Sequence, residues 1–135
     1  MSASLDVVTQ AYKLAKKADH KKLRLLIADD ATWEPARKGD KKPKWNRCKN
    51  ADEVVRTLLW RAGSANRMRP SPAPLELGQS VVIKLRGRRL ERLGARGFWV
   101  PKLFQVIDVK GGKIVRIRDY GTMEEALAGS GGHDA

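Results

Sequence analysis

The sequence has very few of the residues that bind metals or form disulfides. Its 135 residues include one cysteine, Cys48, and two histidines, His20 and His133. One cysteine cannot form a disulfide within the chain, and this set is too small for a plausible zinc site. We therefore expect no metal and no other cofactor. The neighbours Arg47 and Lys49 would lower the pKa of the Cys48 thiol, but without a recognisable base we predict an ordinary thiol.

Long hydrophobic runs are also missing. No apolar stretch approaches the roughly 18 residues of a membrane-spanning helix. The first residues, MSASLDVVTQAYKLAKK, lack the apolar segment of a secretory signal. Hydrophobic residues make up 41% of the chain and charged residues 32%, which is a globular composition, and the length suits one domain. We predict a cytoplasmic protein without a membrane partner, with a single domain over residues 1–128 and a disordered tail over 129–135.

Acidic residues are scarce relative to basic ones. The chain has 28 Lys and Arg against 15 Asp and Glu, a formal net charge of +13. Such an excess attracts polyanions and anionic small ligands, although it can also serve solubility alone because the basic residues are spread along the chain. Two basic segments, 36–49 and 86–96, are candidate anion or nucleic-acid contacts, in which Trp45 would either stack on a base or anchor its loop to the core. The candidate residues are Arg37, Lys41, Lys42, Trp45, Arg88, Arg89 and Arg92.

The order of apolar patterns predicts an α+β fold. Helical spacing of apolar residues predicts helices over 5–17, over 20–28 and from Asn50 to Gly63. Asn50 with Glu53, and later Thr122 with Glu125, have the spacing of capping boxes, and the second of these opens a short terminal helix that ends near Leu127. The segments with strand-like patterns are 30–34, 75–78, 80–86, 100–109 and 114–120.

The last two strands form the clearest unit, a hairpin joined by a Lys-Gly-Gly-Lys turn. Side chains on a strand alternate between its two faces. Val115, Ile117 and Asp119 are therefore predicted to share one face, with Ile114, Arg116, Arg118 and Tyr120 on the other. Because Asp119 continues an apolar face, we expect it to point toward whatever packs on that face.

Several pieces of the sequence resemble the SnoaL-like branch of the nuclear transport factor 2-like (NTF2-like) superfamily. They are Ala18-Asp19, LIADDATW at 26–33, CKNADEV at 48–54, FQV at 104–106 and GGKIVRIRDY at 111–120. The resemblance implies a cone-shaped fold, with three N-terminal helices packed on a curved antiparallel sheet and a short C-terminal helix. It also implies an apolar pocket inside the cone and a homodimer formed through the convex face of the sheet.

The resemblance further implies where catalytic groups would lie, and this sequence departs from that pattern twice. In the ketosteroid isomerases a carboxylate base follows an A-T-x-E motif, which here reads ATWE at 31–34 and is followed by Pro35. The acid that donates to the oxyanion in those enzymes falls at Phe104, which cannot donate a hydrogen bond. We therefore reject steroid isomerisation. What remains similar to the polyketide-cyclase relatives is an acid on the last strand, Asp119.

Asp119 is the candidate catalytic acid or base. Burial in an apolar pocket raises the pKa of a carboxylate and marks many functional sites. With so many cations in the chain, an ion pair that only fixes the sheet is the alternative. The residues predicted to line the pocket, each of which simple core packing also explains, are Tyr12, Trp33, Trp60, Trp99, Phe104, Val115 and Ile117.

Three functions stay open on the sequence alone. The leading hypothesis is a small-molecule-binding protein of the SnoaL-like type, with an apolar or anionic ligand, and an isomerase-, cyclase- or hydrolase-type enzyme if Asp119 carries out acid–base chemistry. The second is a basic binding module for nucleic acid or another acidic partner. The third is a dimerisation domain without a ligand. Nothing in the sequence identifies the ligand.

Overall fold

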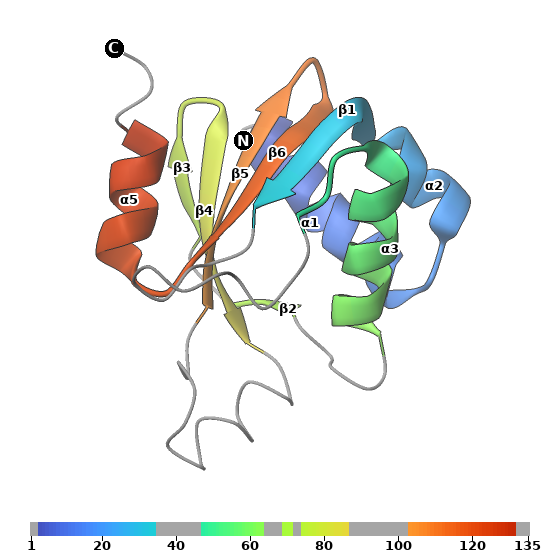
Figure 1. Ribbon diagram of the computed structural model, residues 1–135, viewed down its shortest axis with the longest axis horizontal. Coiled ribbons are helices and arrows are strands. Elements are labelled where there is room, and N and C mark those ends of the chain that lie inside the picture. Colours follow the sequence, from blue (N-terminus) through green and yellow to red (C-terminus); the bar gives the residue numbers. More distant parts are fainter. Residues whose placement is uncertain (1–2, 35–46, 64–68, 72–73, 87–102, 132–135) are drawn as a thin grey trace.

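The structure is a computed structural model that describes residues 3–34, 47–63, 69–71, 74–86 and 103–131. Within these residues, helices lie on both sides of one curved sheet (Figure 1). Helices α1 (Ala3–Lys16), α2 (His20–Leu25) and α3 (Ala51–Ala62) lie on one side, and α5 (Met123–Gly131) lies on the other. None of the helices in these ranges is long and apolar enough to cross a membrane. The predicted α+β class is confirmed.

The sheet of the described residues has six strands in the order β1-β6-β5-β4-β2, with β3 beside β4. The strands are β1 (Ile27–Glu34), β2 (Arg69–Pro70), β3 (Leu75–Leu77), β4 (Ser80–Arg86), β5 (Leu103–Lys110) and β6 (Lys113–Tyr120). Strands β2 to β6 pair antiparallel, whereas β1 pairs with β6 in parallel. The predicted antiparallel pairing is present from β2 to β6, and β1 adds one parallel strand at the edge of the sheet. A parallel pair cannot be joined by a tight turn, and here the chain passes through α3 and the other strands between β1 and β6.

A β-bulge in the β5–β6 hairpin changes which residues face inward. The register shifts between Asp108 and Val109, so β6 has one extra residue at that point. As a result Ile114 and Ile117 both lie in the main core, while Val115 is half-buried outside it. The prediction that Val115 shares a face with Ile117, and that Ile114 does not, was wrong because an extra residue reverses the alternation of side chains.

The helix ends follow the local signals in the sequence. The Asn50 side chain accepts a hydrogen bond from the Glu53 backbone N–H (3.0 Å) and caps α3. Thr122 accepts from the Glu125 backbone N–H (3.2 Å) and caps α5 in the same way. Both predicted N-caps are thus present, while the Glu53 and Glu125 side chains accept from the Lys49 N–H and the Thr122 hydroxyl instead of the N-cap N–H that would complete a capping box. Helix α2 ends at Leu25, earlier than predicted, because the chain has already entered β1 at residue 27.

Each face of the sheet carries its own hydrophobic cluster. The main core lies between α1–α3 and the inner face of the sheet, and its large, fully buried members include Leu23, Ile27 and Leu58. Full burial of side chains of this size contributes about 1.5–3 kcal/mol each. A smaller cluster on the outer face lies under α5 and consists of Val82, Phe104, Val106 and Ala126, with Tyr120 and Met123 beside them.

Helix α5 is fixed to the outer face by polar contacts as well as by this cluster. The buried Arg118 donates from Nη1 to the Gly129 carbonyl (2.8 Å) and forms an ion pair through Nη2 with Asp108 (3.2 Å). The helix continues to Gly131, past the predicted end near Leu127. Helix α5 covers part of the outer face, and a dimer through that face stays a prediction.

Candidate functional site

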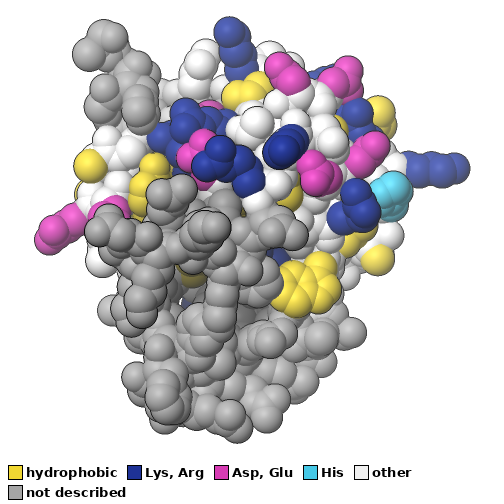
Figure 2. Space-filling model, in the orientation of Figure 1, with side chains coloured by type: hydrophobic (Ala, Val, Ile, Leu, Met, Phe, Trp, Pro, Cys, Tyr) yellow, Lys and Arg dark blue, Asp and Glu magenta, His cyan; other side chains and the backbone are white. Residues whose placement is uncertain are grey.

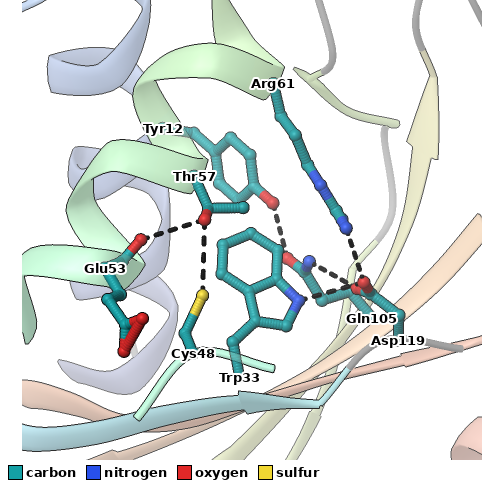
Figure 3. Close-up of polar contacts among 8 residues, drawn as sticks. All are labelled: Tyr12, Trp33, Cys48, Glu53, Thr57, Arg61, Gln105 and Asp119. Carbon is teal, nitrogen blue, oxygen red and sulfur yellow. Dashed lines mark hydrogen bonds and ion pairs between the residues drawn. The ribbon is translucent and has the colours of Figure 1, made fainter. Parts of the chain in front are cut away.

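Five side chains from both layers of the fold meet on the inner face of the sheet. Figure 3 shows Tyr12 from α1 and Arg61 from α3 reaching toward Trp33, Gln105 and Asp119, which lie on β1, β5 and β6. All five are almost fully buried, with exposed fractions of 7% for Tyr12, 4% for Asp119 and 2% or less for the others. We call these five residues the inner polar cluster.

Strand register places three members of the inner polar cluster side by side. Gln105 on β5 is directly opposite Asp119 on β6. Trp33 on β1 is opposite Ile117, two residues before Asp119, so it lies diagonally from the carboxylate. Side chains at direct and diagonal positions on one face lie close enough to interact. The hydrogen bonds that Asp119 accepts from Trp33 and Gln105 agree with the expectation that Asp119 and Ile117 share one face of β6.

The Asp119 carboxylate accepts hydrogen bonds on both of its oxygens. Oδ1 accepts from Gln105 Nε2 at 2.9 Å, and Oδ2 accepts from Trp33 Nε1 at 2.9 Å. Arg61 Nη2 lies 2.9 Å from the same Oδ2, in an ion pair whose side chains are only 3% and 1% exposed. Every partner is a donor, which suits an ionised carboxylate. Of the two alternatives raised for Asp119, the structure has the ion pair.

Tyr12 belongs to the cluster but is separated from the carboxylate by an amide. Its hydroxyl donates to Gln105 Oε1, while the amide nitrogen of the same Gln105 donates to Asp119. Burial raises the pKa of the Tyr12 phenol above its ordinary value, with a further increase from Asp119 and opposing effects from Arg61 and the hydrogen bond to Gln105. Tyr12 is therefore a neutral donor at physiological pH. Because an amide does not readily pass on a proton, Tyr12 and Asp119 do not form a proton relay.

Arg61 also contacts the aromatic member of the cluster. Its guanidinium carbon lies 4.5 Å from the centroid of the Trp33 ring, the geometry of a cation–π contact. Trp33 thus donates to the carboxylate and stacks on the cation that neutralises it. A buried pair of opposite charges is costly to desolvate, and removal of one partner leaves the other charge uncompensated. The cluster is consequently a single coupled unit.

The sequence contains signals for the two cluster members that sequence analysis did not single out. Arg61 falls on the buried stripe of α3, four residues after position 57 and at helical spacing from Val54 and Leu58. Gln105 shares the inner face of β5 with Ile107, two residues further along the strand. A polar residue on an otherwise buried face usually has a hydrogen-bond partner. By this criterion, both Arg61 and Gln105 could have been identified from the sequence as buried polar residues with partners in the interior.

Comparison with known proteins identifies the fold. No protein-family model matches the sequence, and no curated protein is significantly similar to it. Among solved structures, an NTF2-like protein of unknown function from Mesorhizobium loti superposes with a TM-score of 0.61 at 17% identity, covering 87% of this chain and 89% of that one. This chain has the NTF2-like fold. A candidate polyketide cyclase from Sinorhizobium meliloti (TM-score 0.55, 20% identity, 88% and 99% covered) and an LEH-like epoxide hydrolase from M. tuberculosis (0.59, 14%, 95% and 89%) share it.

The NTF2-like fold separates the residues predicted to line a pocket. Tyr12, Trp33 and Ile117 lie on the inner side of the sheet, the first two in the inner polar cluster. Phe104 lies on the outer face under α5, because β5 alternates and its neighbour Gln105 points inward. Trp60 is 45% exposed at the surface of α3. Among the predicted residues that lie outside the described ranges are Trp99 and all of the candidate nucleic-acid contacts, Arg37, Lys41, Lys42, Trp45, Arg88, Arg89 and Arg92.

Cys48 is a buried thiol in the main core, next to α3. It is 4% exposed, and its Sγ lies 3.3 Å from Thr57 Oγ1 (Figure 3). Burial raises the pKa of the Cys48 thiol, and the hydrogen bond to Thr57 only partly opposes this increase. The described part of the chain brings no three His, Cys, Asp or Glu side chains together as a metal ion would require.

Proposed function

We propose that this NTF2-like protein binds a small molecule on the inner side of the sheet, with the inner polar cluster fixing a polar group of the ligand. The observation that carries the proposal is the convergence of Tyr12, Arg61, Gln105 and Asp119 within an otherwise apolar interior. Small-molecule sites in proteins combine mostly apolar walls with a few convergent polar groups. The fold supports it too, since proteins with this fold include a candidate polyketide cyclase and an epoxide hydrolase.

We assign Asp119 a positioning role in this function. A general base must offer a lone pair to the proton that it removes. Asp119 already uses three of its roughly four lone-pair sites on the donors Arg61, Trp33 and Gln105. It is better suited to orient these three side chains. The Tyr12 hydroxyl reaches Asp119 only through Gln105. It is then the group that replaces its hydrogen bond to Gln105 by one to a polar atom of the ligand.

A pair of tyrosine variants tests the proposal. Tyr12→Phe removes one buried hydroxyl from the cluster, and Tyr120→Phe removes one from the opposite side of the sheet, near α5. The probe is anilinonaphthalene sulfonate (ANS), an apolar anionic dye whose fluorescence rises in apolar sites. We expect the native protein to bind ANS in a saturable manner, Tyr12→Phe to bind it several-fold more weakly, and Tyr120→Phe to match the native protein.

Two results would count against the function. One is fluorescence that does not saturate with dye. The other is an equal effect of the two tyrosine variants, which would make the inner polar cluster a structural network alone. Urea unfolding of each variant accompanies the titration, so that weaker binding is read only from protein that is fully folded at the temperature used.

A further inference from the structure

A second feature of the molecule, away from the inner polar cluster, is a group of five lysines at the junction of α1 and α2. All five side chains are exposed. Between residues 13 and 22 the only acid is Asp19. We call this group the lysine corner, and its members are Lys13, Lys16, Lys17, Lys21 and Lys22.

The backbone of the lysine corner is held rigidly. Ala18 has a positive φ of 57°, and its N–H donates to the Ala15 carbonyl (3.1 Å), while the Asp19 N–H reaches back to the Leu14 carbonyl (2.9 Å). This pair of bonds is the Schellman arrangement that ends a helix. Asp19 then caps α2 by accepting from the Lys22 N–H (3.2 Å). The lysines on the two helices are therefore fixed relative to one another at the level of the backbone.

On α1 the lysines share the face that points away from the protein. At 100° per residue, Lys13, Lys16 and Lys17 fall within an arc of about 100°. Ala11 and Ala15, both 1% exposed, lie on the opposite side of the helix against the core. The apolar side of α1 is thus committed to the protein interior, and its basic side is presented to the surroundings.

The charge of the lysine corner is not neutralised within the described residues. The ion pairs found there use Arg24, Arg61, Arg116 and Arg118 as cations, and none of them uses a lysine. The acids Asp29 and Asp52 near α2 are both paired with Arg24. The described part of the face in Figure 2 has basic and acidic side chains interspersed.

We propose that the lysine corner binds the phosphate backbone of a nucleic acid without reading its sequence. Flexible lysine stems on a convex corner contact phosphates as separate point charges, unlike the converging donors that hold one small anion. A membrane surface fits less well, because a membrane-bound amphipathic helix inserts its apolar side, and that side of α1 is buried in the core. The surface is distinct from the inner polar cluster, so either function can fail without the other.

The test compares two variants that lose the same charge from different places. Lys16→Gln, Lys17→Gln and Lys21→Gln together remove three members of the lysine corner. Lys84→Gln, Lys110→Gln and Lys113→Gln together remove three exposed lysines on β4 and the β5–β6 hairpin. The probe is a fluorescein-labelled 20-base-pair DNA duplex of arbitrary sequence, followed by anisotropy between about 50 and 200 mM NaCl. Circular dichroism checks that both triple variants keep the native fold.

Each phosphate contact contributes about −0.9 to the slope of log K against log[salt]. We expect the corner triple variant to lose about three units of slope relative to the native protein, and the control triple variant to lose less than one. Two duplexes of unrelated sequence should bind alike. Equal losses in the two triple variants would overturn the proposal, since bulk charge would then be sufficient. Absence of duplex binding at 50 mM NaCl would also overturn it, as would lysine-dependent binding to phosphatidylserine vesicles in place of DNA.

Discussion

The Asp119 carboxylate and the Arg61 guanidinium lie 2.9 Å apart in the interior, on β6 and α3, with side chains that are 1% and 3% exposed. Two neutral donors, Trp33 Nε1 and Gln105 Nε2, share the same carboxylate. The pair therefore connects a helix to three neighbouring strands. This arrangement makes the charges interdependent and gives the interior its main polar feature.

Loss of the Asp119 charge should destabilise the protein strongly. Asp119→Asn replaces an acceptor oxygen by a donor and leaves Arg61 buried without a counter-charge, a change that costs about 3–5 kcal/mol. The matched control is Glu34→Gln, which breaks the exposed pair with Arg116 (3.7 Å) and should cost less than about 1 kcal/mol. Urea unfolding followed by circular dichroism measures both. Similar losses of unfolding free energy in the two variants would show that the buried Arg61–Asp119 pair contributes no more to stability than an exposed ion pair.

The double variant Arg61→Met with Asp119→Asn should be less destabilised than the sum of the two single variants. Each single change leaves one unmatched charge in the interior, whereas the double change leaves none. Coupling energies of this kind reach about 0.5–3 kcal/mol for residues in contact. A complete double-mutant cycle, again by urea unfolding, provides the value. Strict additivity would mean that Arg61 and Asp119 contribute independently.

Tyr12 should make stability fall at alkaline pH. Burial raises the pKa of its phenol, so the unfolded chain loses this proton near pH 10 while the folded chain keeps it. The resulting stabilisation is fully present below about pH 10 and is lost as the pH rises from there toward the raised pKa of the folded state. Between about pH 9 and 11.5, the free energy of unfolding should fall more steeply with pH for the native protein than for Tyr12→Phe, by up to about 1.4 kcal/mol per pH unit. Urea unfolding at each pH measures this free energy. The same pH dependence of the unfolding free energy in the native protein and in Tyr12→Phe would contradict the burial of the Tyr12 hydroxyl.

A side chain at Gly129 should loosen α5. A Cβ at this position would lie 2.7 Å from the Tyr120 ring carbon Cζ and closer still to the hydroxyl, so either the ring or the helix must move. Overpacking of this kind costs about 1–3 kcal/mol. Tyr120→Leu in the background of Gly129→Ala should recover part of the loss by removing the ring. Amide hydrogen exchange of residues 123–129 reports the docking of α5, and unchanged protection in Gly129→Ala would contradict the tight contact.

Sequence was sufficient for most of the fold because the signals are local. Asn50 and Thr122 identify helix starts from their own side chains, and the Gly-Gly turn sets the β5–β6 hairpin. Alternation along β6 correctly connected Asp119 with Ile117, because the strand is regular between these two residues. Such features depend on a few consecutive residues, which is the range over which patterns in a sequence can be read.

The remaining features depend on contacts between distant segments. The bulge that turns Ile114 inward exists only relative to the partner strand β5. The placement of α5 depends on Arg118, whose hydrogen bond to Gly129 spans two elements. Phe104, which was predicted to line the pocket, lies in the cluster under α5, and this position depends on the pairing of β5 with its neighbours. Tertiary contacts, which no local pattern encodes, decided each of these cases.

The most direct test of the central claim is the indole N–H signal of Trp33 in a proton–nitrogen correlation spectrum, recorded while ANS is added. The chain has four tryptophans, and the Trp33→Phe spectrum identifies the signal. Trp33 Nε1 donates to Asp119 inside the inner polar cluster, while Trp60 is 45% exposed on α3 and provides an internal control. We predict a saturable shift of the Trp33 signal that Tyr12→Phe weakens, with the Trp60 signal unmoved. An unmoved Trp33 signal at dye concentrations that saturate the fluorescence would contradict a ligand site at the inner polar cluster.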